Sequence, residues 1–318
     1  MKTKKRMIGI ILAVVGASFW GLGGTVSDYL FRFRHIDVNW YVTARLLFSG
    51  VILMIIFKIL NPKHSIFTIF SNFTSTIQML IFSIFGMLLV QYSYMASIDE
   101  GNAAIATLLQ YIAPVYIIFW FIIRGQTTLK IFDLLAITLT LTGTFLLLTN
   151  GSLSRLVVPT SSITWGVISG IALAFYTIYA TKLLVNFSSI LVVGWAMLIS
   201  GILMNFKAPL WQLDVSQITF STLSYLGFGI IGGTAIAFFF FIKSLQYLSA
   251  KETTLFGTIE PVMAIVASAV WLKVTFLPFQ LLGIVLIMLL ILMLSLKRVI
   301  QIKINTLLIK RLQLYDLL

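Results

Sequence analysis

Long apolar stretches recur along the whole chain, from Met7 to Leu296, and short polar segments separate them. Each stretch holds about 20 residues, the length that an α-helix needs to cross the roughly 30 Å hydrocarbon core of a bilayer. Apolar and polar residues do not alternate within them, so the pattern predicts helices rather than barrel strands. The ten predicted spans cover residues 7–31, 39–59, 76–97, 102–123, 130–150, 160–183, 188–207, 222–243, 254–272 and 279–297. The predicted fold is an all-α integral membrane protein.

The composition agrees with this fold. Hydrophobic residues make up 60% of the 318 residues and charged residues only 10%, whereas about 25% of a soluble domain is charged. The chain has no cysteine, which excludes disulfides and a thiolate metal site. Its two histidines, His35 and His64, fall in short loops, so we expect neither a metal nor a cofactor. The basic residues at positions 2–6 resemble the start of a secretory signal, but the apolar run continues to Phe31 without a clear cleavage site, as in an uncleaved first helix.

The distribution of positive charge predicts how the spans are oriented. Ten spans place both termini on one side, and of the 22 Lys and Arg residues 16 fall on that side, five on the other and Arg45 within a span. By the positive-inside rule both termini are expected to be cytoplasmic. The net charge of +13 then serves orientation, and we expect no nucleic-acid partner. Abundant Ile, Lys and Asn with few His and no Cys suit the plasma membrane of a bacterium.

Residues 299–318 are predicted to form a basic cytoplasmic tail. Ile and Leu recur between Lys303, Lys310 and Arg311 at a spacing that fits an amphipathic helix on the membrane surface. A basic tail without further structure is the simpler alternative.

The chain also contains an internal repeat. A shift of 147 positions places Ile112-Ala113-Pro114 on Ile259-Glu260-Pro261. A shift of 155 positions places Ala17-Ser18-Phe19-Trp20 on Ala172-Leu173-Ala174-Phe175. The proline shared in mid-helix is the strongest of these matches, because leucine-rich segments match by chance far more easily.

The repeat divides the chain into two halves, residues 1–150 and 151–298, with five predicted spans each. An odd number of spans turns the second half upside down in the membrane. Inverted repeats of this kind are typical of secondary transporters, in which the two halves open a central site alternately to each side.

Four segments carry a resemblance to a known family. They are Trp20-Gly21-Leu22-Gly23-Gly24-Thr25-Val26, Ala44-Arg45-Leu46-Leu47, the alanine-rich stretch from Ala103 to Pro114, and Ala250 to Pro261 with its Glu260-Pro261. Together they resemble the drug/metabolite transporter superfamily in its ten-helix form, built from two EamA-type repeats. The resemblance covers about residues 7–297 and implies a transporter.

The chain departs from this family in one respect. The family often closes its fourth and ninth helices with Gly-Glu, where this chain has Gly125-Gln126 and Leu272-Lys273, so no role of that glutamate carries over. The segment Phe19–Phe31 also resembles the first helix of a choline permease of the same superfamily. One segment does not identify a substrate.

Two charged residues, Arg45 and Glu260, fall well inside predicted spans and away from their ends, where a charge costs roughly 2.5–3.5 kcal/mol or more and is usually functional. Arg45 is a candidate to bind a substrate carboxylate; the alternatives are a snorkelling arginine or a buried pair with Asp28. Glu260, beside Pro261, is a candidate to bind a cationic substrate or to exchange protons during transport. The alternative is a neutral acid that is hydrogen-bonded to a neighbouring helix. Its counterpart in the first repeat is Ala113.

Further candidates for substrate contact are the polar and aromatic residues at comparable depth. They are Trp20, Gln91, Tyr94, Gln110, Tyr111, Tyr176 and Tyr179. Together they suit an amphipathic or quaternary-ammonium solute, although each alone fits helix packing equally well.

The sequence therefore favours a secondary transporter of a small organic solute, such as an amino acid, amine, metabolite or drug, working by alternating access. No Walker motif is present, so ATP is not expected to drive it directly, and proton coupling through Glu260 is a hypothesis. A lipid flippase is the main alternative, and a non-transport polytopic membrane protein is a more distant one. An enzyme is not expected, because the acids are scattered singly and no predicted span contains His or Cys. The expected partners are the substrate and the bilayer, with the chain a monomer or homodimer.

Overall fold

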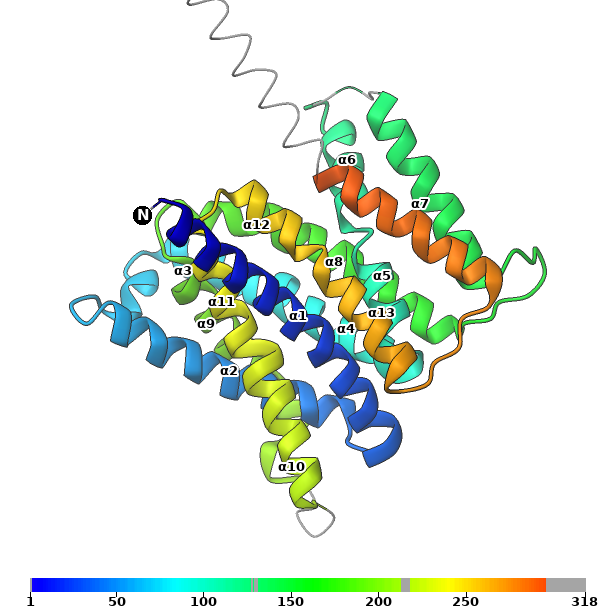
Figure 1. The fold of residues 1–318 in the computed structure, drawn as a ribbon. Coiled ribbons are helices and arrows are strands. Elements are labelled where there is room, and N and C mark those ends of the chain that lie inside the picture. Colours follow the sequence, from blue (N-terminus) through cyan, green and yellow to red (C-terminus); the bar gives the residue numbers. More distant parts are fainter. Residues whose placement is uncertain (1, 127, 129–130, 213–217, 296–318) are drawn as a thin grey trace, which may run out of the picture.

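The computed structural model describes residues 2–126, 128, 131–212 and 218–295, and every regular element among them is a helix (Figure 1). In chain order these are α1 (Lys2–Arg34), α2 (Val38–Leu60), η1 (Ile66–Phe70), α3 (Phe73–Ile81), η2 (Phe82–Leu88), α4 (Leu89–Glu100), α5 (Ala103–Gln110), α6 (Ala113–Ile123), α7 (Ile131–Thr149), α8 (Thr160–Leu184), α9 (Ser189–Lys207), η3 (Leu210–Gln212), α10 (Phe220–Gly227), η5 (Phe228–Ile236), α11 (Ala237–Ser244), α12 (Ala250–Gly257) and α13 (Ile259–Val270). A last helix covers Pro278–Ser295.

All ten predicted spans are found as helical segments. Nine helices in the described part of the chain are long and apolar enough to cross a membrane. The ninth predicted span, 254–272, corresponds to α12 and α13, whose apolar part, Leu255–Val270, is shorter. The prediction of an all-α membrane fold is confirmed.

The second helices of the two repeats, α2 and α9, pack along each other and hold each other's loops. Trp40 in α2 donates its indole N–H to the carbonyl of Leu210, after α9, at 3.0 Å. Trp195 in α9 donates in the same way to Ile66, after α2, at 2.7 Å. The two tryptophans are related by the 155-position shift seen in the sequence. Each repeat therefore holds a loop of the other through a tryptophan–carbonyl hydrogen bond, as expected for inverted repeats about a common axis.

The third helix of each repeat changes to π geometry in its middle, at η2 and η5. A π-helical turn interrupts the regular i→i−4 ladder and leaves carbonyl oxygens that need another partner. Ser200 in α9 donates to the carbonyl of Ser83 in η2 at 2.8 Å. Ser49 in α2 donates to the carbonyl of Ile230 in η5 at 2.9 Å. Each interrupted helix is thus completed by a serine from the other repeat.

The fifth helices of the repeats, α7 and Pro278–Ser295, run side by side at one edge of the molecule (Figure 1). The side chain of Asn150, after α7, accepts hydrogen bonds from the backbone N–H groups of Phe279 and Gln280 at 3.0 and 3.3 Å. Gln280 donates in turn to the carbonyl of Leu147 at 3.0 Å. These bonds fix the start of the last helix on the end of α7.

Helix α1 crosses η5 at very close range. A Cβ atom added to Gly233 would lie 2.7 Å from the Cα atom of Gly23, and one added to Gly23 would lie 2.8 Å from the Cα atom of Gly233. Small residues let membrane helices approach backbone to backbone in this way. The crossing holds the first helix of one repeat against the third helix of the other.

The N-terminal end of α1 is joined to the start of α12. Arg6 forms an exposed ion pair with Glu252 at 3.0 Å. Glu252 also completes a capping box, in which its carboxylate accepts from the backbone N–H and the hydroxyl of Ser249 at 3.0 and 2.9 Å. The carboxylate of Glu252 therefore both pairs with Arg6 and caps the start of α12.

Some predictions lie beyond what the structure describes. The basic tail, residues 299–318, falls outside the described residues. The exact boundaries of the two halves and the side of the membrane on which the termini lie remain predictions.

The close crossing of α1 and η5 predicts the effect of a single methyl group. Gly233→Ala should lower the melting temperature of the purified protein, because the crossing helices must separate, and overpacking typically costs about 1–3 kcal/mol. Gly227→Ala is the matched control, since a Cβ atom there meets nothing within 4 Å. Equal melting temperatures for the two variants would contradict the crossing.

The capping box predicts a pH-dependent contribution to stability. Hydrogen bonds from Ser249, and then Arg6, lower the pKa of Glu252 from its ordinary value of 4.5. A group whose pKa is lower in the folded state stabilises it above the ordinary pKa and loses that contribution as the pH falls through the folded value. Glu252→Gln should therefore melt below the wild type at pH 7, and the gap should narrow towards pH 4. A gap that stays constant between these pH values would contradict this assignment.

Candidate functional site

The fourth helix of each repeat is broken within the membrane. In the first repeat, α5 ends at Gln110 and α6 begins at Ala113, with Pro114 in its first turn. In the second, α12 ends at Gly257 and α13 begins at Ile259. A proline is tolerated in the first turn of a helix because its missing N–H has no intrahelical partner there. The prolines matched in the sequence therefore mark two equivalent breaks.

A hydrogen bond joins the two breaks. The hydroxyl of Tyr111, in the first break, donates to Glu260 Oε2 at 2.8 Å and also lies 3.1 Å from the carbonyl oxygen of Gly257. Glu260 occupies the first turn of α13, where the helix dipole favours negative charge. Tyr111 and Glu260 are only partly buried, so both keep accessible surface within the membrane-spanning helices.

Arg45 is buried in α2, with 4% of its surface exposed. Its Nε donates to the hydroxyl oxygen of Thr234, in η5, at 2.6 Å, and Nη1 lies 3.2 Å from the sulfur of Met95, in α4. Thr234 donates in turn to the carbonyl of Gly229 at 2.9 Å, within the same π-helix. Among the described residues Arg45 forms no ion pair. A guanidinium has five N–H donors, and these contacts occupy two of its three nitrogens.

The alternative pairing of Arg45 with Asp28 is wrong. Asp28 is fully buried and pairs with Arg32, one turn along α1, at 2.6 Å. It also accepts a hydrogen bond from the backbone N–H of Ala103 at 2.9 Å, and Arg32 donates to the carbonyl of Gly101. Asp28 is therefore paired with Arg32 on its own helix and bonded to the start of α5, and it does not neutralise the charge of Arg45.

Tyr94, in α4, forms a hydrogen bond with α5, the first part of the broken helix of the first repeat. Its hydroxyl is 2.8 Å from that of Thr107 in α5, and Thr107 lies one helical turn before Tyr111, on the same face. Tyr94 also precedes Met95, whose sulfur is 3.2 Å from Arg45 Nη1. We call these three hydrogen-bonded pairs together the central polar cluster. It consists of Arg45, Tyr94, Thr107, Tyr111, Thr234 and Glu260.

The central polar cluster offers complementary chemistry. The Arg45 guanidinium can bind a carboxylate or phosphate, and the Glu260 carboxylate can bind an ammonium group or a proton. Arg45 and Glu260 form no ion pair with each other. The described residues contain no group of three acids or histidines that could hold a metal ion.

The other predicted residues lie in separate groups. Trp20 packs against Phe238 and Phe241 of α11, with ring centroids 4.8 Å apart in each case. Gln110 donates to the hydroxyl of Ser169 in α8 at 2.7 Å. Gln91 is buried in α4, one turn before Tyr94. No hydrogen bond joins these three described residues to the central polar cluster.

The two tyrosines of α8 form an aromatic group with η2. Tyr176 lies 4.8 Å from the ring of Phe82, and Tyr179 stacks on Phe175 at 5.1 Å. The ammonium of Lys182 sits 4.8 Å from the ring centre of Tyr179. The predicted aromatic residues therefore lie in separate groups: Trp20 with α11, Tyr176 and Tyr179 on α8 beside η2, and Tyr94 and Tyr111 in the central polar cluster.

Sequence reasoning missed three residues of this region, Met95, Thr107 and Thr234. The only signal for the threonines was a hydroxyl in the middle of an apolar span. Thr107 also falls in the stretch from Ala103 to Pro114, and Thr234 follows a Gly-Gly pair. Met95 gave no signal, because a methionine in a membrane helix reads as ordinary packing.

Comparison with known proteins agrees with this architecture. The sequence pattern of the EamA-like transporter family matches residues 7–149 and 160–296, one match to each repeat. The uncharacterized inner membrane transporter YicL of Salmonella typhimurium is 30% identical over 296 residues, which cover 92% of this chain and 96% of the relative. An uncharacterized transporter of Archaeoglobus fulgidus is 28% identical over 172 residues, 54% of this chain and 59% of the relative.

A solved crystal structure shares the fold. It aligns with a TM-score of 0.59 at 14% sequence identity and covers 92% of this chain and 96% of its own. The two family matches coincide with the two halves of the fold, and the Salmonella relative extends over nearly the full length. The chain is a multi-pass membrane protein that belongs to the EamA-like transporter family.

Proposed function

We propose that this protein is a secondary transporter of a small organic solute and that the central polar cluster is its substrate site. The observation that carries the proposal is the hydrogen bond between Tyr111 and Glu260, which joins the two equivalent helix breaks inside the membrane. Broken helices at the interface of inverted repeats are where secondary transporters commonly bind substrate and coupling ions. A charged side chain kept at such a place is costly and is usually retained for function.

The inverted repeats support transport by alternating access. The repeats hold each other through equivalent bonds, those of Trp40 and Trp195 and those of Ser49 and Ser200. If the two repeats exchange conformations, the site between them opens first to one side of the membrane and then to the other. The central polar cluster draws residues from both repeats, so such an exchange would change its access.

The substrate is proposed to contact both charged residues. Arg45 is held by Thr234 and has no acidic partner among the described residues, so it can bind a carboxylate or another anionic group. Glu260 accepts a hydrogen bond from Tyr111 and can bind a cationic group or a proton. Amino acids, amines and small metabolites or drugs are the solute classes that fit this pair.

Proton coupling through Glu260 forms part of the proposal. Glu260 keeps accessible surface in the membrane, and the hydroxyl of Tyr111 can stay bonded to it or to the Gly257 carbonyl. A carboxyl group with an adjustable neighbour can take up and release a proton with little rearrangement. We further propose a bacterial plasma membrane location with both termini cytoplasmic, from the 16-to-5 bias of positive charge.

The proton-coupling role predicts the behaviour of Glu260→Gln in proteoliposomes. The amide keeps the size of the side chain and can still accept from Tyr111, but it cannot exchange a proton. Imposing a gradient of one pH unit should raise wild-type accumulation up to about tenfold, since one unit corresponds to about 1.36 kcal/mol. The variant should show no such rise. Glu252→Gln, which removes an exposed carboxyl outside the apolar spans, should behave as the wild type.

The experiment has a clear negative result. If Glu260→Gln accumulates substrate in response to the pH gradient as the wild type does, Glu260 is not the coupling residue. That result would leave the proposed substrate site open, and ligand binding to the Arg45→Lys variant tests the site separately.

The substrate site predicts a selective loss of binding in Arg45→Lys. A thermal-shift screen of the detergent-purified protein against amino acids, amines including choline, nucleosides and cationic dyes, at two pH values, should find a stabilising ligand. Lysine keeps the charge but loses the planar fork of donors. We therefore expect the ligand that stabilises the wild type to bind about tenfold more weakly, since a hydrogen bond to a charged group contributes about 1.5–3 kcal/mol.

Arg124→Lys is the matched control, because Arg124 stacks on Trp120 near the end of α6, outside the central polar cluster. Equal binding by Arg45→Lys and the wild type would remove Arg45 from the site. A screen in which only lipids stabilise the protein, and in which Arg45→Lys removes that stabilisation, would favour a lipid flippase over a solute transporter.

A further inference from the structure

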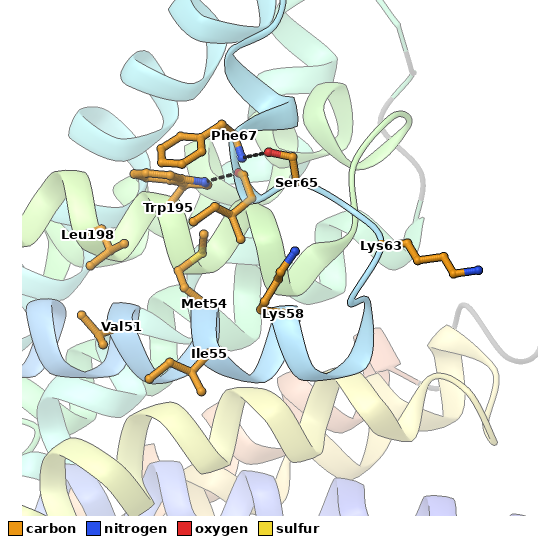
Figure 2. A pocket seen from close by; sticks show the side chains of 10 residues that line it. Val51, Met54, Ile55, Lys58, Lys63, Ser65, Phe67, Trp195 and Leu198 are labelled. Atoms are coloured by element: carbon orange, nitrogen blue, oxygen red, sulfur yellow. Dashed lines mark hydrogen bonds between the residues drawn. The ribbon is translucent and has the colours of Figure 1, made fainter.

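A groove lies apart from the central polar cluster, between the end of α2, the loop with η1, and α9 (Figure 2). Its volume is about 610 Å³. Most of its lining is apolar, and Val51, Ile55 and Phe67 are each about half exposed. The lining residues are Val51, Met54, Ile55, Lys58, Lys63, Ser65, Ile66, Phe67, Trp195 and Leu198.

The wall beside α9 is held in place by hydrogen bonds and aromatic packing. Trp195 donates its indole N–H to the carbonyl of Ile66 at 2.7 Å, and its ring centroid is 5.5 Å from that of Phe67. The backbone N–H of Phe67 is capped by the side chain of Ser65 at 3.2 Å (Figure 2). Hydrogen bonds and ring packing therefore fix the position of the apolar wall.

Lys58 places a positive charge at the mouth of this groove. It lies in the last turn of α2, and Figure 2 shows its ammonium directed towards the loop that contains Ser65. Its Nζ donates to the carbonyls of Pro62 and His64 at 2.9 and 3.3 Å. An ammonium has three donors, so one is left for a ligand. Lys63 is also on the rim, but its side chain points away from the groove (Figure 2).

The equivalent place on the opposite face of the protein serves as an internal comparison. A groove of about 380 Å³ lies beside Trp40, the counterpart of Trp195. Its lining includes Arg34 and His35, but also the carboxylate of Asp37, which caps α2 by accepting from Trp40 N–H at 2.8 Å. The groove with Lys58 contains no acid. Of these two grooves in the described part of the chain, the one with Lys58 is therefore the positive and apolar one, and it lies on the face shared with the N-terminus.

We propose that this groove binds an anionic phospholipid of the leaflet on the N-terminal side, as a bound ligand and not as transported cargo. The phosphate would meet Lys58 at the level of the helix ends, where headgroups lie. One acyl chain would follow the apolar wall of Met54, Leu198 and Trp195. Basic pockets between membrane helices are known to favour anionic headgroups.

Charge and shape together select this occupant. A free phosphate would satisfy Lys58 but would leave the apolar wall uncovered, and a neutral lipid would cover the wall but leave the ammonium without an anion. The C-terminal tail carries Lys303, Lys310 and Arg311, so its charge is repelled by Lys58. Only an amphipathic anion matches both parts of the groove.

The test compares lipids that differ only in headgroup. The full-length protein, delipidated in a mild detergent, is titrated with phosphatidylglycerol or phosphatidylcholine of the same acyl chains while its melting temperature is recorded. We expect phosphatidylglycerol to stabilise the wild type at lower concentration than phosphatidylcholine. Lys58→Gln should weaken phosphatidylglycerol binding about fivefold, the effect of roughly one lysine at the membrane surface. Ile55→Trp, which fills the groove from an exposed position, should weaken both lipids.

Lys5→Gln is the matched control, because it removes one positive charge from an exposed residue on the same side of the membrane. It should bind phosphatidylglycerol as the wild type does. The proposal is overturned if the two lipids bind equally to the wild type, or if Lys5→Gln and Lys58→Gln lose the same affinity. It is also overturned if inorganic phosphate stabilises as much as phosphatidylglycerol, or if Ile55→Trp binds phosphatidylglycerol normally.

Discussion

Every backbone N–H and carbonyl group that enters the hydrocarbon must find its partner inside the protein, because no water is present there to replace it. In the part of the chain that the structure describes, four interruptions occur within membrane-spanning helices, at η2, at η5 and at the two breaks. The carbonyl of Gly257, at the end of α12, lies within reach of the Tyr111 hydroxyl. The π-helices receive serine hydroxyls from the opposite repeat. Side-chain hydroxyls of one repeat therefore bind carbonyl groups that the interruptions expose in the other repeat. Polar side chains consequently lie at these interruptions.

The symmetry of the backbone does not extend to its chemistry. The position equivalent to Glu260 is Ala113, and the position equivalent to Tyr111 is Thr258. The second repeat thus contributes the acid and the first repeat its hydroxyl partner, so the two breaks form one charged site and not two. Arg45 adds the opposite charge from α2. A symmetric scaffold with an asymmetric cluster can reverse its access while keeping a single set of ligands.

The sequence predicted the membrane-spanning helices and their repeat, but it did not predict the side-chain contacts between the helices. Uniform hydrophobicity located every span, because span length is a local property. Pro114 and Pro261 identified the two equivalent helices, but the sequence predicted each as one continuous span, and the structure shows a break in each. The π-helices had no signal, since a one-residue change in helical register leaves an apolar segment equally apolar. Asp28 was considered as a partner of Arg45, yet Arg32 is nearer along the same helix. The link between Arg45 and Thr234 depends on how two repeats pack, which no local pattern encodes.

Helix α1 is tied at both ends to the helices that break. Near one end Asp28 binds the start of α5 at Ala103, and near the other Arg6 binds the start of α12 at Glu252. The ties differ in strength. Asp28 is fully buried, and a hydrogen bond to a charged group, such as the one that Ala103 donates to it, contributes about 1.5–3 kcal/mol, whereas an exposed ion pair such as that of Arg6 contributes about 1 kcal/mol or less. Ala103 belongs to the same repeat as α1, and Glu252 belongs to the other repeat. The stronger tie therefore holds α1 within its own repeat, and of these two ties only the weaker one joins α1 to the second repeat.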